Sequence, residues 1–173
     1  MKAALDLIEQ IVEEHKTIRL RLQSMEQIVN DAEALQGFEE AQEGFMPGRF
    51  DQKAGLDRLE ELVNLVDQGL QAHFDREETA LLAAFEEQGD RELASAFHSL
   101  LLEHEDLRNR LTYTKNHISQ LTGGELPRHH WEATAYDMRA HITHTRKLLE
   151  AHAEVEQELL QSLRRRLLGE KEG

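Results

Sequence analysis

The sequence predicts an all-α fold: an antiparallel up-down four-helix bundle in which residues 1–173 form a single domain. The length of 173 residues is that of one domain. Leu, Glu, Ala and Gln are abundant, whereas there are only two prolines and ten glycines, a composition that favours helix almost throughout. Apolar residues recur at helical spacing in four blocks, and strand signals are absent.

The first block predicts a helix over about residues 3–35. Its apolar stripe consists of Leu5, Ile8, Val12, Ile18, Leu22, Met25 and Val29. The stretch QGFEEAQEGFMPGRFDQK, residues 36–53, then introduces three glycines and a proline, and it predicts a long connection.

The second block predicts a helix over about residues 54–87. Its stripe consists of Leu59, Leu62, Val66, Leu70, Ala80 and Leu81. The tripeptide QGD at 88–90 ends this helix, with Gly89 as the stop and Asp90 as the N-cap of the next helix.

The third and fourth blocks predict helices over about residues 91–121 and 127–168. Their stripes consist of Leu93, Phe97, Leu100, Leu107, Leu111, Thr114 and Ile118, and of Trp131, Met138, Ile142, Leu148, Val155, Leu159 and Leu163. Pro127 suits the first turn of the last helix. Four amphipathic helices with short second and third connections are typical of an antiparallel bundle.

Charge and composition exclude several classes of function. The net charge of −14 argues against a nucleic-acid partner. The chain has no cysteine, which excludes disulfides, thiolate metal sites and thiol catalysis. The opening residues lack the apolar core of a signal peptide, and no apolar run approaches the length of a membrane span. We therefore expect a cytoplasmic protein with no membrane partner.

Ten histidines in a chain of this length are unusual. One histidine on each predicted helix falls on the apolar stripe and so points toward the bundle axis: His15, His73, His104 and His152. Glu77 and Glu156 follow two of them after four residues, which is about 6 Å or one turn further along the helix.

The two halves of the chain resemble each other around these residues. EEHKTIRLRL (13–22) matches LEHEDLRNRL (102–111), and HFDREETALL (73–82) matches HAEVEQELLQ (152–161). Two copies of one helical hairpin, related by a pseudo-twofold axis, would place four imidazoles and two carboxylates at one level of the bundle.

A metal centre is the interpretation that best accounts for such a layer. Buried carboxylates are costly unless they are paired or bind a cation. Imidazole and carboxylate ligands without sulfur suit iron, manganese or zinc. Two glutamates can each bridge two ions about 3.5–4 Å apart, which leaves two histidines for each ion and open positions for a small molecule. The alternative is a metal-free polar layer whose members hydrogen-bond to one another.

The remaining histidines are expected to serve other roles. His98 lies off the inward face, and His144 is less inward than the six residues above. His117, His129 and His130 lie near helix ends and are expected to be solvated. His141 is about 16 Å from His152 along the helix, so it is either a hydrogen-bonded core residue or part of a proton or access path. Phe74 either lines the site or packs.

Together, these residues resemble the hemerythrin-like (HHE cation-binding) family over nearly the whole chain. The matching residues are His15 in EEHKTIR, His73 and Glu77 in HFDREE, His104 in LEHEDLR, and His152 and Glu156 in HAEVEQE. The resemblance implies two iron ions with carboxylate and oxo or hydroxo bridges. It also implies binding or sensing of O2, NO or peroxide, iron handling, or repair of damaged iron centres.

Two departures distinguish the chain from the oxygen carriers of that family. The positions four residues from His104 hold Leu100 and Arg108 instead of a second histidine, and position 157 holds Gln instead of Asp. The His-x-x-x-Glu pattern of the last helix is closer to the iron-repair and iron-sensing branches. The ferritin-like alternative fails because the residues three before His73, His104 and His152 are leucines.

Three functions remain open at this stage. The first is a di-iron protein that binds or senses a small ligand or handles iron, with any signal leaving through an unidentified protein partner. The second is a redox or iron-centre-repair enzyme that uses the same site. The third is a metal-free helical interaction module.

Overall fold

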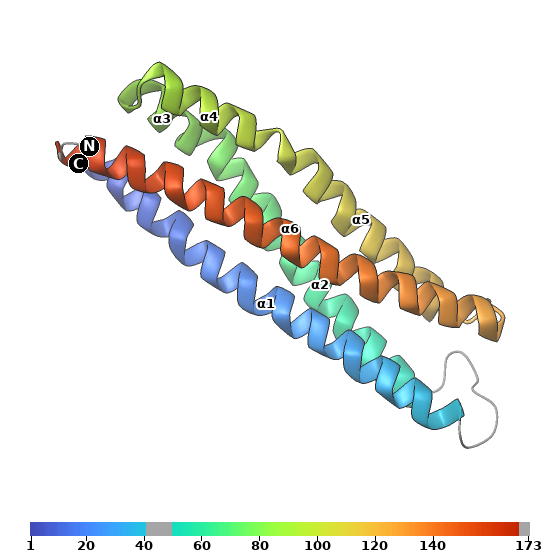
Figure 1. Cartoon of the computed structure of the whole chain (residues 1–173). Coiled ribbons are helices and arrows are strands. Elements are labelled where there is room, and N and C mark those ends of the chain that lie inside the picture. The colour runs from blue at the N-terminus through green and yellow to red at the C-terminus, as the bar shows by residue number, and fades with distance from the viewer. Residues whose placement is uncertain (41–49, 170–173) are drawn as a thin grey trace.

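The computed structural model describes the backbone of residues 1–40 and 50–169, and the side chains of residues 1–26 and 55–169. Within these ranges the chain is helical and contains no strand, which confirms the predicted all-α class (Figure 1). The elements are α1 (Lys2–Glu40), α2 (Phe50–Arg76), the π-helical segment η1 (Glu77–Leu81), α3 (Leu82–Gln88), α4 (Arg91–Leu101), α5 (Glu103–Thr122) and α6 (Arg128–Leu168).

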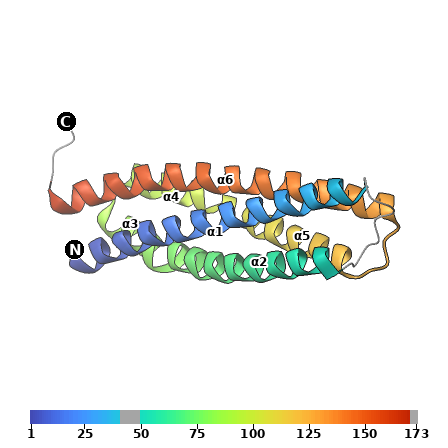
Figure 2. The ribbon, with the colours of Figure 1, turned by 90° about the horizontal axis from the view of Figure 1, so that it is seen from below.

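These elements combine into four long helical rods in the described part of the chain: α1, α2–η1–α3, α4–α5, and α6 (Figure 1). Helix α1 contacts α2 and α6, and α5 contacts the same two helices. Figure 2 shows the start of α1 and the end of α6 at the same end of the molecule. Since each rod contacts two neighbours, side chains from all four rods can meet along a common axis.

The first connection is shorter than the sequence predicts. Helix α1 continues through Gly37 to Glu40, and α2 already begins at Phe50. Residues 41–49 of the predicted connection and the side chain of Val29 lie outside the described residues.

The second connection contains the helix stop at Gly89 and the N-cap at Asp90 that the sequence predicts. The Asp90 carboxylate accepts a hydrogen bond of 2.8 Å from the backbone N–H of Leu93, so Asp90 is the N-cap of α4. Gly89 ends α3 with an extended backbone at φ −77°. A Cβ added at Gly89 would lie 2.4 Å from the carbonyl oxygen of Phe85, so this stop depends on a close approach.

Two helical irregularities occur next to predicted site residues. The π-helical segment η1 starts at Glu77, and such wide turns occur frequently at functional sites. The predicted helix over 91–121 is interrupted at Leu102, whose N–H donates to the carbonyl of Ser99 at 3.3 Å. Leu102 is 80% exposed, and this tight turn immediately precedes Glu103 and His104.

The core consists of two apolar clusters, with the predicted polar residues lying between them along the helices. One cluster includes Leu70, Phe74, Leu107 and Leu149. The other, toward the chain ends, includes Ile11, Leu81, Leu100 and Leu160, together with Phe85 and Phe97, whose rings stack at a centroid distance of 4.2 Å. The polar layer is therefore enclosed from above and below by hydrophobic packing.

The stripe predicted for the last helix was wrong at one position. Val155 is 49% exposed, and Ala80 of the second stripe is also exposed. The buried face of α6 runs instead through Leu149, His152, Glu156 and Leu160. His152 and Glu156 occupy core positions of α6. A stripe drawn through apolar residues alone therefore placed the buried face of this helix one residue too early at Val155.

We expect Gly89→Ala to destabilise the protein by about 1–3 kcal/mol, because the new methyl group would press against backbone rather than a movable side chain. The matched control is Gly55→Ala within α2, where an added Cβ meets nothing within 4 Å. That control should stabilise the protein by about 0.5–1 kcal/mol through helix propensity. Urea unfolding followed by circular dichroism measures both, and equal effects would contradict the close approach at Gly89.

Candidate metal centre

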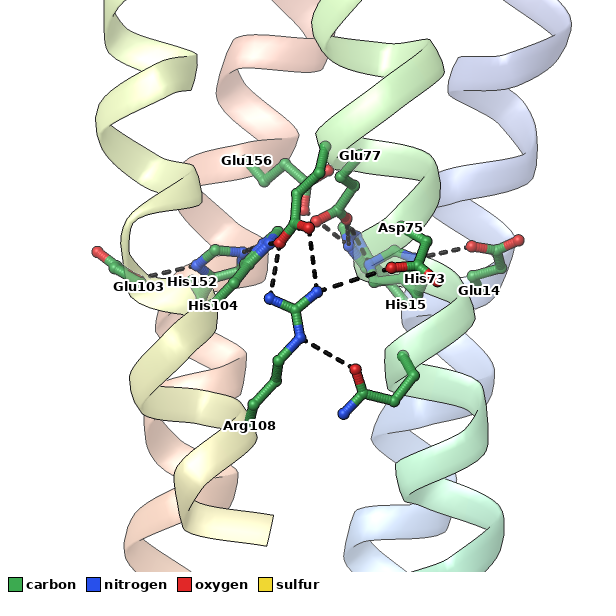
Figure 3. Close-up of polar contacts among 12 residues, drawn as sticks. Glu14, His15, His73, Asp75, Glu77, Glu103, His104, Arg108, His152 and Glu156 are labelled. Carbon is green, nitrogen blue, oxygen red and sulfur yellow. Dashed lines mark hydrogen bonds and ion pairs between the residues drawn. The ribbon is translucent and has the colours of Figure 1, made fainter. Parts of the chain in front are cut away.

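The structure brings all six predicted site residues together at one level of the four rods (Figure 3). They are contributed by α1, by α2 with η1, by α5 and by α6: His15, His73, Glu77, His104, His152 and Glu156. The side chain of His15 is 11% exposed, and those of the other five are buried. Their ligand atoms form two groups, and within each group these atoms lie within 4.8 Å of one another.

The first group consists of His15, His73, Glu77 and Glu156. The Nε2 atom of His15 lies 2.9 Å from Glu156 Oε2 and 3.7 Å from Glu77 Oε1. The Nε2 atom of His73 lies 2.5 Å from the same Glu77 oxygen. Two imidazoles and two carboxylates thus converge on one position.

The second group consists of Glu77, His104 and His152. The Nε2 atom of His104 lies 2.9 Å from Glu77 Oε2 and 3.2 Å from the Nε2 atom of His152. Glu77 belongs to both groups, with one oxygen facing each, whereas Glu156 belongs only to the first. Two glutamates were predicted to bridge, and only Glu77 faces both groups.

Three glutamates that sequence reasoning missed hold the outer sides of the histidine rings. The Nδ1 atoms of His73, His104 and His152 lie 2.7, 2.8 and 2.9 Å from carboxylate oxygens of Glu14, Glu78 and Glu103, respectively. An Nδ1–H that donates to a carboxylate fixes the tautomer and directs the Nε2 lone pair inward. Each of these glutamates is the sequence neighbour of a predicted ligand, and that adjacency was the available signal.

The close approach of His104 and His152 also points to a cation. With both Nδ1 atoms donating outward, the two Nε2 atoms face each other with their lone pairs at 3.2 Å. Such an arrangement is repulsive unless a proton or a cation lies between the nitrogens.

Arg108 closes the α2–α5 side of the layer (Figure 3). Its guanidinium donates to both oxygens of Glu78, at 2.8 and 3.1 Å, and to the side-chain oxygen of Gln71 at 3.0 Å. It also lies over the ring of Phe74 at 5.1 Å, and Phe74 stacks on His104 at 3.9 Å. Phe74 therefore lines the site, which resolves the choice that the sequence left open.

Five buried atoms of the layer form no hydrogen bond with the described residues, although several have a close neighbour. They are Nε2 of His15 and both carboxylate oxygens of Glu77 and of Glu156. Leaving buried polar groups unsatisfied is costly, and a metal ion satisfies such atoms directly. The donors are nitrogen and oxygen, which fit iron, manganese or zinc. These residues can hold a metal ion.

Burial and neighbouring charges shift the protonation of this layer. Burial lowers the pKa of His15, but contacts with Glu156 and Glu77 outweigh it and raise the pKa from 6.5 to about 9. Burial, aided by the charge of Glu77, raises the pKa of Glu156 from 4.5 to about 7. The pKa of Glu77 stays well below its ordinary value despite burial, because three histidines contact it.

The histidines outside the layer have separate partners. His98 is exposed beside Glu86, and His129, His130 and His144 are also exposed. The expectation for His117 was wrong: it is buried, and its Nδ1–H donates to the Tyr113 carbonyl at 2.9 Å. His141 is partly buried and donates from Nε2 to the Arg110 carbonyl at 3.0 Å, as a hydrogen-bonded core histidine would.

Comparison with known proteins adds no assignment. No protein-family model, curated protein or solved structure matches the chain. None of the helices in the described ranges is both long enough and apolar enough to cross a bilayer.

The pKa shifts of His15 and Glu156 predict opposite pH dependences for metal-free stability and metal binding. The folded pKa values of these two groups lie above those of the unfolded chain. Glu156 therefore contributes stability below about pH 4.5 that is lost as the pH rises through about 7, and His15 contributes stability below about 6.5 that is lost through about 9. A metal ion must displace the same protons.

Between pH 7 and 9, we expect metal affinity to increase about tenfold per pH unit, because one proton leaves His15 on binding. Cobalt(II) titrations against a chelator with known protonation constants measure this slope. Proton release can be measured independently by calorimetry in two buffers of different ionisation enthalpy. An affinity that is flat over this range would contradict the assignment of His15 as a protonated ligand.

Proposed function

We propose that this protein is a dinuclear non-haem iron protein of the hemerythrin-like kind, in which the four rods form an antiparallel up-down bundle. One observation carries the proposal: two groups of buried ligand atoms share Glu77, and five atoms of the layer lack hydrogen-bond partners among the described residues. Glu77 would bridge the two ions, with His15 and His73 on one and His104 and His152 on the other.

Iron is the metal that we infer, because the six residues resemble the ligands of the hemerythrin-like family; the imidazole and carboxylate donors and the absence of cysteine are compatible with it. Manganese and zinc accept the same donors and are the alternatives. When bound, a dinuclear iron centre supplies redox chemistry and binding of small ligands. The role of the chain is to orient the imidazoles through Glu14, Glu78 and Glu103, and to enclose the layer between two apolar clusters.

We infer that the centre binds or senses a small ligand such as O2, NO or peroxide, or handles iron. A cavity of about 30 Å³ adjoins the layer and is lined mainly by apolar side chains, including those of Ile18, Leu22, Leu70, Phe74 and Leu149. This volume is of the order needed for one water-sized molecule. The cavity also borders His15, His73 and His152, so a small molecule there would lie beside the candidate ligands.

A redox or iron-centre-repair enzyme is the second candidate. The group of His104, His152 and Glu77 has three protein ligands, whereas the other group has four. An ion held by fewer protein ligands retains more positions for a reacting molecule. Turnover of peroxide or O2 by the iron-loaded protein favours this candidate, and a reversible spectral change without turnover favours the binding or sensing function.

The iron-loaded protein should contain about two ions per chain, and Glu77→Ala should lose both together with the dinuclear optical signature, since Glu77 faces both groups. Glu156→Ala should chiefly weaken the group of His15 and His73. The control His141→Ala should keep both ions, since it lies about 16 Å away along α6. Elemental analysis and absorption spectra test this. Less than one ion per chain after anaerobic reconstitution with ferrous iron would contradict the proposal.

Removing the metal should lower the melting temperature, because the layer buries charges that the cation compensates. Metal at 100 times its Kd stabilises the folded state by about 2.7 kcal/mol, which corresponds to a shift of about 5–10 °C for a chain of this size. Calorimetry of the metal-free and loaded forms at one pH measures the shift. Melting temperatures within a degree of each other would support a metal-free polar layer instead.

A further inference from the structure

The four inward histidines are not held equally. His73, His104 and His152 each have a carboxylate oxygen within 2.9 Å of Nδ1. Two of these carboxylates are themselves held by arginines, since Glu14 pairs with Arg76 at 2.6 Å and Glu78 pairs with Arg108 at 2.8 Å. Within the described side chains, His15 forms no hydrogen bond through Nδ1.

The carboxylates follow a consistent order around the rods. Helix α1 supplies Glu14 to the histidine of α2, η1 supplies Glu78 to the histidine of α5, and α5 supplies Glu103 to the histidine of α6. By the same order, a carboxylate of α6 would contact the Nδ1 atom of His15 in α1. There Gln157 follows Glu156, just as Glu78 follows Glu77, so the corresponding side chain carries no charge. The order is interrupted at His15.

His15 also differs from the other histidines in its exposure. Its side chain is 11% exposed, whereas those of the other three are 3% exposed or less. The cavity of about 30 Å³ borders His15, as it borders His73 and His152, so there is free space beside its ring. An anchored imidazole must break a charge-assisted hydrogen bond before it can turn away, and His15 has no such bond at Nδ1.

We propose that Glu14, Glu78 and Glu103 are positioning residues that fix three histidines as permanent metal ligands, whereas His15 is an exchangeable ligand whose place an added small ligand can take. This inference rests on the proposed metal centre. It makes the position of His15, beside the cavity, the point at which an external molecule reaches the centre.

The positioning residues are tested with cobalt(II), whose visible absorption reports its coordination. Glu103→Gln and Glu78→Gln should weaken cobalt binding about 10–100-fold, the range found for removal of outer-shell carboxylates. Glu13→Gln is the matched control, because this exposed glutamate adjoins Glu14 and pairs only with Lys16 at 2.5 Å through its carboxylate. It should leave binding unchanged. If Glu103→Gln binds cobalt as tightly as Glu13→Gln does, the positioning role is overturned.

The exchangeable ligand is tested by comparing His15→Ala with His152→Ala. His15→Ala should keep the cobalt stoichiometry of the parent protein, and added imidazole should restore the parent spectrum. His152→Ala should lose an ion. If His15→Ala loses as much cobalt as His152→Ala does, the inference is overturned while the proposed centre stands.

Two further measurements keep the outcomes distinct. Circular dichroism of the metal-free variants checks that each variant is folded. If His152→Ala is unfolded, the cobalt affinity of Glu103→Gln tests the proposal instead. Glu103 is 58% exposed, so its substitution removes no core packing. A parent protein that binds neither cobalt(II) nor iron(II) overturns the proposed function together with this inference.

Discussion

The buried carboxylate of Glu77 requires three helical rods to come together at one level of the molecule. Its side chain is fully buried, and its two oxygens face histidines from three different rods at 2.5, 2.9 and 3.7 Å. A carboxylate in such a position is costly unless positive charge surrounds it. Helices α1, α2 and α5 must therefore meet at this level, and η1 widens the helix at the residue concerned.

The layer is built in successive shells around the axis. Inward carboxylates contact imidazoles, the imidazoles contact outer carboxylates, and two of those outer carboxylates contact Arg76 and Arg108. The tight turn at Leu102 directly precedes Glu103 and His104, whose side chains have different partners. Glu103 contacts His152 of α6, and His104 contacts Glu77 at the bundle axis.

Functionally, the asymmetry of the layer matters more than its pseudo-twofold pattern. The repeat predicts two equivalent halves, yet Glu77 belongs to both ligand groups and Glu156 to one. Gln157 stands where the other half has Glu78, and the apolar cavity borders His15. Two ions bound by such a layer would differ in the number of protein ligands and in the exposure of their histidines.

The helical class and the six inward polar residues could be predicted from the sequence, because a 3.6-residue period fixes which side chains share a face. The helix start at Asp90 could be predicted as well, since capping is local chemistry. The sequence did not predict the partners of Glu14, Glu78 and Glu103, the interruption at Leu102 or the burial of His117. These features depend on the neighbouring rod, and a helical period carries no information about which side chain a neighbour presents.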